Sequence, residues 1–253
     1  MTNQSEKFQA FAALHVPGDP VILFNAWDAG SAQAVAAAGA KAIATGSASV
    51  AGAHGFSDAE ALPIGLALAN AARVVESVAL PVTIDFEGAY AVEPAGVAAS
   101  MARLAATGAI GCNFEDQIIG GTGLHESADH AARIAAAREA VGADFFINAR
   151  TDIFLKAKPE THDAAMVDAA LERARAYADA GATGFFVPLL ADLALLERFC
   201  AASPLPVNFM AFPGAPSAKE VAVTGVARIS HGPFPWRLAM AALKEAAAKE
   251  YGG

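Results

Sequence analysis

Eight short apolar segments, separated by longer segments with a helical pattern, constrain the fold of this chain more than any other feature. Each is four to eight residues long and nearly continuous in apolar residues, which is typical of parallel strands buried on both faces. They cover residues 21–26, 42–47, 82–87, 109–116, 145–151, 184–189, 207–210 and 228–232. Eight strand–helix units in 253 residues predict an α/β fold of the (β/α)8 type, a TIM barrel.

The helical segments between these strands support the same organisation. Several end in a glycine just before the next strand, as helix C-termini often do: Gly39, Gly108, Gly142 and Gly181. A doubly wound open sheet is the main alternative, but it usually has fewer strands, and no GxGxxG motif follows the first strand. No linker or change of composition divides the chain, so residues 1–253 are predicted to form one domain.

Composition argues against several classes of partner. The formal net charge is −9 and Lys and Arg form no cluster, which disfavours binding to nucleic acid or to an anionic membrane. No apolar run reaches the roughly 18 residues of a membrane span, and the N-terminal residues lack the pattern of a secretory signal. The two cysteines show no pairing by spacing, which fits a reducing compartment. We therefore expect a cytoplasmic protein that acts on a small molecule.

Polar side chains gather at one end of the predicted strands. In a (β/α)8 barrel the active site lies at the C-terminal ends of the strands. The polar residues at or just after those ends are Asn25, Asp28, Thr45, Ser47, Asp85, Glu87, Glu115, Asp116, Arg150, Asp152, Asn208, Ser230 and His231. The opposite ends are mostly apolar or small. This asymmetry predicts an active site at the C-terminal end of the barrel.

Strand alternation brings three of these acids together. If Asp85 points into the barrel, Glu87 does so too, and Glu115 and Arg150 do the same on the following strands. Three converging carboxylates repel one another unless a cation lies among them. An oxygen-only ligand set favours Mg²⁺, with Mn²⁺ possible, over zinc. Asp85, Glu87 and Glu115 are thus predicted to bind the metal, and the alternative is a salt-bridged barrel plug in which Arg150 neutralises the acids.

Seven segments, each at a predicted strand end, carry a resemblance to a known superfamily. They are FNAWDAGSA (24–32), ATGSASVAGAHGFSD (44–58), PVTIDFEGAY (81–90), NFEDQ (113–117), INARTD (147–152), PVNFM (206–210) and GVARISHGP (225–233). Over nearly its full length the chain resembles the isocitrate lyase/phosphoenolpyruvate mutase superfamily. The resemblance implies cleavage or formation of a C–C or P–C bond next to a 2-oxo acid, through a pyruvate-type enolate.

The resemblance also implies roles for individual residues and an assembly. The expected catalytic residues are Arg150, Glu115 and Asp58. The expected substrate-binding residues are Thr45, Gly46, Ser47, Arg150, Asn208 and Tyr90, with the backbone N–H groups of Gly46 and Ser47 binding the carboxylate of the 2-oxo or 2-hydroxy acid. The implied assembly is a homodimer or homotetramer in which the last helix is exchanged with a neighbouring subunit.

Two positions depart from the superfamily pattern. Glu87 stands where an aspartate is usual. In the loop after the fourth strand, isocitrate and methylisocitrate lyases carry Lys-Lys-Cys-Gly-His and phosphonopyruvate-type enzymes carry Lys-x-Asn, whereas this chain has IIGGTGLHESADH (118–130). The loop therefore argues against isocitrate lyase proper and also against phosphonopyruvate mutase. His130, at the end of this segment, is expected at the surface.

The expected function is a Mg²⁺-dependent carbon–carbon lyase or hydrolase acting on a 2-oxo acid. One alternative is a phosphonopyruvate-type mutase or hydrolase. The other belongs to a different class: a non-catalytic protein that binds 2-oxo acids on the same barrel and has lost its proton donor.

Overall fold

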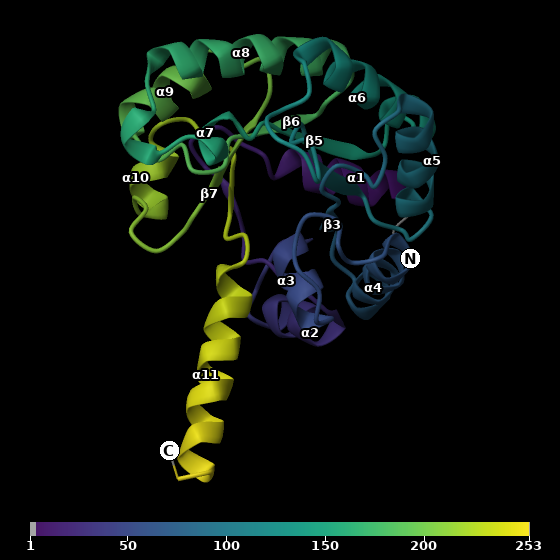
Figure 1. Ribbon diagram of the computed structural model, residues 1–253, viewed down its shortest axis with the longest axis vertical. Helices are drawn as coiled ribbons and strands as arrows, with labels where there is room; N and C mark the ends of the chain where they lie inside the picture. Colours follow the sequence, from purple (N-terminus) through teal and green to yellow (C-terminus); the bar gives the residue numbers. More distant parts are fainter. Residues whose placement is uncertain (1–3, 253) are drawn as a thin grey trace.

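The eight predicted strands are all present, as one parallel sheet, in the computed structural model, which describes residues 4–252 (Figure 1). They are β1 (Val21–Leu23), β2 (Ile43–Ala44), β3 (Val82–Asp85), β4 (Gly111–Glu115), β5 (Phe146–Arg150), β6 (Gly184–Phe186), β7 (Val207–Met210) and β8 (Arg228–Ser230). Strands that follow one another from β2 to β8 are paired, and β8 also pairs with β1. A parallel bridge between Ala26 and Thr45 joins the two remaining edges, so the sheet closes into the predicted (β/α)8 barrel.

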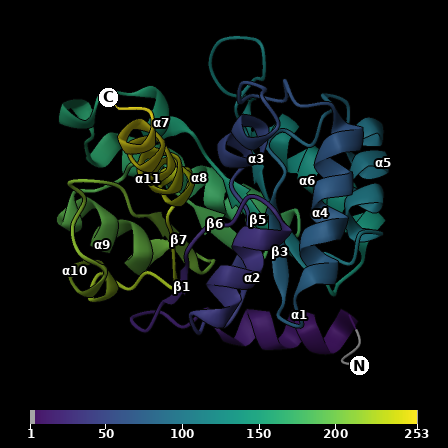
Figure 2. The same cartoon turned by 90° about the horizontal axis from the view of Figure 1, so that it is seen from below.

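Helices surround this barrel, and one covers its N-terminal end (Figure 2). They are α1 (Gln4–Ala13), α2 (Ala29–Ala37), α3 (Ser47–Ala53), α4 (Ile64–Ser77), α5 (Pro94–Ala105), α6 (Ser127–Val141), α7 (Ile153–Lys156), α8 (Ala164–Asp179), α9 (Leu193–Ala202), α10 (Ala218–Ala222) and α11 (Phe234–Glu250), with a 3₁₀ turn at Pro159–Thr161. Phe11 of α1 packs edge-on against Phe146 of β5, with ring centroids 5.2 Å apart. The N-terminal end of the barrel is thus closed by apolar packing, which leaves the C-terminal end for the site.

Local sequence sets where several helices begin and end. The side chains of Asp28, Asp163 and Asp192 accept a hydrogen bond from a backbone N–H in the first turn of α2, α8 and α9. Gly142, which was predicted to end a helix, is the cap residue of α6 and has a φ of 73°, a conformation that L-residues rarely adopt. The helix boundaries therefore follow from capping residues that the sequence displays.

The main apolar core lies between the strands and the helices, whereas the barrel interior is polar. Ile84, Phe114 and Phe185 face the helices and are almost fully buried. Inside the barrel, the positions that usually hold bulky branched residues carry buried polar side chains. These are Thr83, Asn113, Asn148, Asn208 and Arg228. This polar interior lies directly beneath the predicted site and supplies hydrogen bonds to it.

Two further features of the fold bear on the sequence-based predictions. His130 is fully buried, contrary to the expected surface position, because its ring packs between Phe114 and Tyr177 and its Nδ1 lies 2.9 Å from Nη1 of Arg133. The last helix, α11, stands away from the barrel (Figure 1). Among residues 4–252, no helix is both long and apolar enough to cross a membrane.

Candidate active site

A cavity of about 190 Å³ opens at the C-terminal ends of the strands. Its lining residues are Asn25, Gly46, Ser47, Ala48, Asp58, Asp85, Asn113, Arg150, Leu155, Phe186, Pro188, Met210, Ser230, Gly232, Pro233 and Arg237. A smaller cavity of about 20 Å³ adjoins it, and Ser47 and Asp85 line both. The predicted end of the barrel therefore carries the concave site, and Asp85 lies where the two cavities meet.

Asp85, the last residue of β3, is held by its neighbours on both sides. Its Oδ2 accepts a hydrogen bond from the backbone N–H of Ser47 at 2.9 Å, and its own N–H donates to Oγ1 of Thr45 at 3.0 Å. Nδ2 of Asn113, from the polar interior, lies 3.4 Å from its Oδ1. Ser47 N–H, which the resemblance assigns to the substrate carboxylate, is thus engaged by Asp85 in this structure.

Two further acids, Asp58 and Glu87, lie near Asp85, and none of the three is paired with a basic side chain among residues 4–252. Burial and the negative charges of Asp58 and Asp85 raise the pKa of Glu87 to about 8. Partial burial and Asp85 also raise the pKa of Asp58. Within the part of the chain that the structure describes, none of these three acids forms an ion pair. Asp58 lines the larger cavity, Glu87 the smaller one and Asp85 both, and these three acids are called the acidic wall below.

Arg150, the last residue of β5, is paired with two acids. Its Nη1 lies 2.7 Å from Oε2 of Glu115, and its Nε and Nη2 donate to the two carboxylate oxygens of Asp152 at 2.6 and 2.9 Å. The guanidinium also lies over the ring of Phe186, 5.7 Å from its centroid. Burial opposes its charge, but the Glu115 and Asp152 carboxylates raise the pKa of Arg150 above its usual value. Arg150, Glu115 and Asp152 are called the paired wall below.

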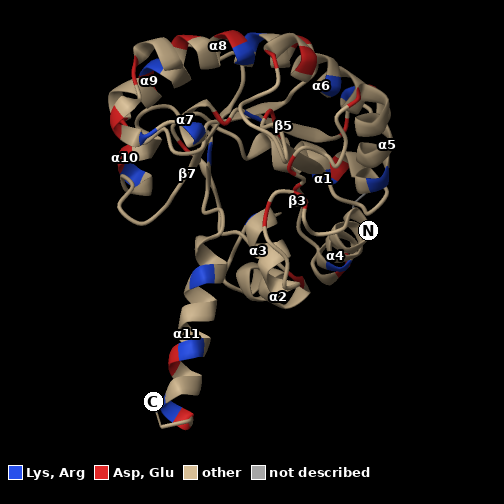
Figure 3. Cartoon of the chain, in the orientation of Figure 1, with Lys and Arg blue, Asp and Glu red and all other residues tan. Residues whose placement is uncertain are grey.

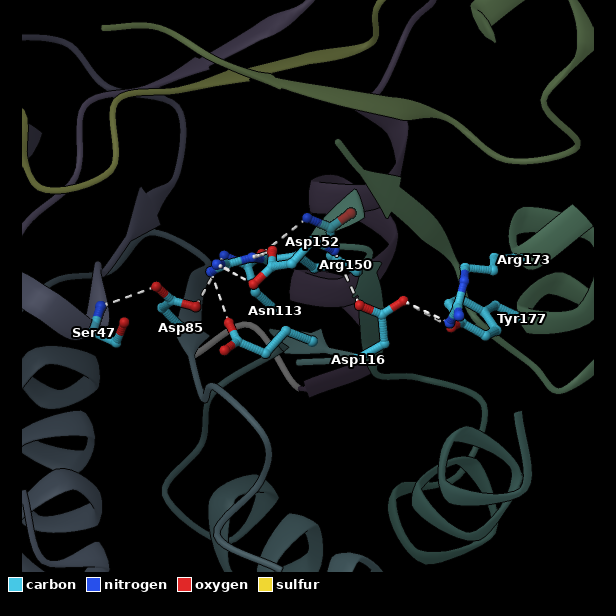
Figure 4. Close-up of polar contacts among 10 residues, drawn as sticks. Ser47, Asp85, Asn113, Asp116, Arg150, Asp152, Arg173 and Tyr177 are labelled. Carbon is cyan, nitrogen blue, oxygen red and sulfur yellow. Dashed lines mark hydrogen bonds and ion pairs between the residues drawn. The ribbon is translucent and has the colours of Figure 1, made fainter. Parts of the chain in front are cut away.

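A second row of buried groups orients the paired wall from behind (Figure 4). Oδ1 of Asp116 accepts the backbone N–H of Asp152 at 3.0 Å. Its Oδ2 accepts from Nη1 of Arg173 and from the hydroxyl of Tyr177, both at 3.0 Å. Arg173 and Tyr177 lie one turn apart on α8 and were not identified from the sequence, where they read as part of an ordinary helical pattern.

The remaining predicted site residues lie in different surroundings. Tyr90 and Thr45 line the smaller cavity rather than the larger one. Asn208 is buried in the barrel interior, where its Nδ2 donates to Oγ of Ser230 at 3.1 Å. Gly46 lines the larger cavity, and a Cβ there would lie only 3.2 Å from the carbonyl oxygen of Gly232, which explains the glycine. Arg237 of α11 also lines the larger cavity, and no sequence pattern predicted it.

The acidic wall fits a divalent cation that keeps part of its water shell. Among the described residues, no three His, Cys, Asp or Glu side chains are placed to ligate one ion together. Mg²⁺ commonly binds through one or two carboxylates and retains several waters. Burial, and after it the repulsion between neighbouring carboxylates, raises the pKa values of Asp58 and Glu87, and a cation bound there would relieve that repulsion. Glu115 is already paired with Arg150, so it suits a water-mediated contact better than a direct one.

Charge elsewhere on the molecule gives no competing site. Lys and Arg are dispersed among Asp and Glu over the outer helices, while acidic residues recur around the barrel end near β3 (Figure 3). The cavity at the C-terminal end is therefore the site that the geometry favours for small-molecule chemistry.

Comparison with known proteins agrees with this geometry. The family model for phosphoenolpyruvate phosphomutase matches residues 11–250. A crystal structure from Burkholderia cenocepacia J2315, of a protein assigned provisionally as a phosphonomutase, is 51% identical, covers 99% of this chain and 100% of that one, and superposes with a TM-score of 0.94. The 2-methylisocitrate lyase of Escherichia coli K12 is 28% identical over 208 residues, covering 79% of this chain and 68% of that protein.

A phosphonopyruvate hydrolase solved with oxalate and Mg²⁺ has the same fold, with a TM-score of 0.84 at 22% identity, over 98% of this chain and 88% of that one. Mutases, lyases and hydrolases thus share this barrel, and the family match spans almost the whole chain. The chain belongs to the phosphoenolpyruvate phosphomutase family, within the isocitrate lyase/phosphoenolpyruvate mutase superfamily.

Proposed function

We propose that this protein is a Mg²⁺-dependent lyase or hydrolase that cleaves a C–C or P–C bond adjacent to a 2-oxo acid. The single observation that carries the proposal is that two carboxyl groups without an ion pair within residues 4–252, Asp58 and Asp85, line the same cavity as the paired guanidinium of Arg150. Among the described residues, Asp58, Asp85 and Glu87 form no ion pair, whereas Arg150 presents a guanidinium that two carboxylates hold in place. A 2-oxo acid chelated to a cation at the acidic wall and held by Arg150 would use both groups of side chains.

The acidic wall would hold the metal. Asp85 is the best-placed direct ligand, since it lines both cavities, and Asp58, Glu87 and Glu115 would act through water. When bound, Mg²⁺ would act as a Lewis acid that polarises the keto group of the substrate. The hydrogen bond from Ser47 N–H to Asp85 then has a consequence for binding: that N–H becomes free for the substrate carboxylate only when Asp85 turns toward the cavity.

Arg150 would stabilise the charge that develops on the substrate. Breaking the bond to C3 of a 2-oxo acid moves an electron pair toward the keto oxygen. A donor already fixed in place lowers that barrier more than one that must reorient. Glu115 and Asp152 fix the guanidinium of Arg150, and Asp116 in turn fixes Asp152, so little reorganisation remains at the moment of reaction.

The lining of the cavity also bears on the substrate class. Arg237 supplies a second guanidinium to the same cavity, from the first turn of α11. A guanidinium at that place suits a second carboxylate or a phosphonate on the substrate. We therefore propose a 2-oxo or 2-hydroxy acid with two anionic groups rather than a simple monoacid.

The test is a panel of 2-oxo and 2-hydroxy diacids and phosphonopyruvate, assayed with and without Mg²⁺ by coupled detection of pyruvate. We expect Mg²⁺-dependent release of pyruvate, or of another 2-oxo acid, from one class of compound. Phosphonopyruvate is the specific alternative, favoured by the 51% identity to the Burkholderia protein, and release of phosphate or formation of phosphoenolpyruvate would identify it. Tight binding of 2-oxo acids with no turnover of any compound would replace the enzyme with a binding protein.

We further propose a homodimer or homotetramer assembled through α11. This helix stands away from its own barrel and exposes Leu238, Met240 and Leu243 (Figure 1). Phe24, beside the base of α11, is also exposed, so the apolar surface extends from the helix onto the barrel. Light scattering on the full chain should give a multiple of 25.7 kDa, and a monomer at micromolar concentration would contradict this assembly.

A further inference from the structure

Two loops beside the acidic wall have an unusual backbone. Six non-glycine residues among those described have positive φ, and five of them lie in these two loops. They are Ala59 (66°), Glu60 (57°), Glu87 (50°), Ala89 (64°) and Tyr90 (56°). Such conformations are uncommon for residues with a side chain, and they persist where the surroundings determine them. The two loops carry Asp58 and Glu87, so the strain is located at the acidic wall, where the metal is proposed to bind.

Glu60 connects the two loops by reciprocal hydrogen bonds. Its backbone N–H donates to Oε2 of Glu87 at 2.7 Å, and its own Oε1 accepts the backbone N–H of Tyr90 at 2.7 Å. Between those two residues is Gly88, where a Cβ would lie 3.0 Å from Oε1 of Glu60. The loop after β3 therefore needs both the carboxylate of Glu60 and the small residue beside it.

Arg133 holds the same loop from the other side. Its Nη2 donates to the carbonyl oxygens of Gly88 at 2.7 Å and Ala91 at 3.0 Å. The side chain is 3% exposed, and its guanidinium lies over the ring of Phe114, 4.9 Å from the centroid. An anion thus accepts from the N–H groups of the loop while a cation donates to its carbonyl groups, and the two together fix one conformation.

We propose that Glu60 is a positioning residue for the acidic wall, which would bind the metal. This inference rests on the proposed Mg²⁺-dependent function. Glu60 does not line either of the two cavities described, so it does not itself face the substrate. It holds Oε2 of Glu87, which leaves only Oε1 of that carboxylate for a water of the metal. Its bond to Tyr90 keeps the strained turn that aims Glu87 toward Asp85. Groups that orient a metal site from behind commonly contribute 10–100-fold in metal affinity or activity.

The test compares Glu60→Ala, Glu60→Gln and Glu93→Ala in the full chain. Glu93 is an exposed acid three residues beyond Tyr90 with no capping hydrogen bond, so its variant controls for the loss of one negative charge nearby. Calorimetric titration with Mg²⁺ alone should give an affinity roughly 10–100-fold weaker for Glu60→Ala. Glu60→Gln, which keeps an acceptor oxygen for Tyr90 N–H, should bind Mg²⁺ with an affinity close to that of the wild type, as should Glu93→Ala. Amide exchange in the metal-free protein should be faster at Tyr90 in Glu60→Ala alone.

The outcomes separate this inference from the function on which it rests. Equal Mg²⁺ affinity in wild type and Glu60→Ala overturns the positioning role and leaves the proposed function in place. A wild-type protein that binds no Mg²⁺ overturns both the proposed function and the metal-positioning role. A loss of affinity that Gln does not restore also overturns the inference, because a clamp built on the acceptor oxygen survives that change. Unchanged exchange at Tyr90 shows that Glu60 does not hold the loop.

Discussion

The acidic wall and the paired wall lie side by side at the C-terminal end of the barrel, where the backbone N–H of Glu115 donates to the carbonyl oxygen of Glu87 at 2.9 Å, yet their charges are arranged in opposite ways. On the paired wall every charge has a partner: Arg150 contacts two carboxylates, and Asp116 behind them contacts Arg173 and Tyr177. On the acidic wall, Asp85 receives only hydrogen bonds from neutral donors. Both walls are formed by adjacent strands of the same barrel, so the fold itself does not cause the difference.

This contrast teaches how stability and function are divided across the site. A buried ion pair loses stability when either partner is removed, since the remaining charge stays buried without compensation. A cluster of like charges behaves in the opposite way, because removing one member relieves repulsion. The paired wall is therefore expected to be needed for folding as well as chemistry, whereas the acidic wall lowers the stability of the metal-free protein and is retained for binding.

The largest expected effect comes from Asp85→Ala. Activity should be abolished and Mg²⁺ binding weakened strongly, because the best-placed direct ligand is lost. The thermal midpoint of the metal-free protein should stay equal or rise, since one of several clustered acids is gone. Calorimetry with Mg²⁺ and a thermal melt check the two parts separately. Unchanged Mg²⁺ affinity would show that the acidic wall does not bind the metal.

Next in size is Arg150→Lys, which keeps the charge and loses the planar fork that grips Asp152. If Arg150 stabilises the developing oxyanion, kcat should fall by about 10²–10³, the usual loss for one preorganised donor. If it only binds the ground state, KM should rise while kcat changes little. We expect the fall in kcat. Steady-state kinetics on the substrate found in the panel distinguish the two results.

A smaller loss, in stability rather than rate, is expected for Asp116→Ala. The substitution leaves Arg173 and the buried Tyr177 hydroxyl without their shared acceptor, so the free energy of unfolding should drop by about 3 kcal/mol. Urea unfolding measures this, and Asp85→Ala is the matched control from the other wall. Equal effects of the two substitutions would remove the distinction between the walls.

The sequence predicted the strands and the end of the barrel that bears the site because both leave simple patterns. Buried parallel strands are apolar runs, and polar residues after them mark the C-terminal end. The runs overestimated strand length: that ending at Glu87 stops at Asp85 in the structure. Glu87 then adopts a positive φ, so strand alternation does not describe how it reaches Asp85.

Other site residues could not have been predicted, for physical reasons. Arg173, Tyr177 and Arg237 lie on helices, where periodicity identifies an apolar face but not the partner of a polar side chain. Glu60 acts through its backbone N–H and through a turn of non-glycine residues with positive φ. Neither feature can be predicted from the residue types in the sequence. The buried position of His130 likewise depends on Arg133 and two aromatic rings that come together only in the fold.

The smallest expected effect concerns His15, at the N-terminal end of the barrel. Because this residue belongs to neither wall, it serves as a reference for the effects at the site. His15 lies beneath the polar interior, with its ring stacked on Phe146 at a centroid distance of 4.4 Å and its Nδ1 2.9 Å from the carbonyl oxygen of Phe11. Burial, assisted by the positive charge of Arg228, lowers the pKa of His15 to about 3. The folded state therefore keeps this ring neutral at pH values where the unfolded chain has taken up a proton.

The sign of the pH dependence follows from that shift. The unfolded pKa is near 6.5, so the stabilisation is fully present above that value and is lost progressively as pH falls toward 3. Between about pH 6 and 4, His15→Gln should flatten the pH dependence of the free energy of unfolding by about 1.4 kcal/mol per pH unit relative to wild type. Urea unfolding of both proteins across this range measures the difference. Parallel curves would show that His15 is already protonated or exposed in the folded state, and that the N-terminal end of the barrel is more open to water than its apolar packing indicates.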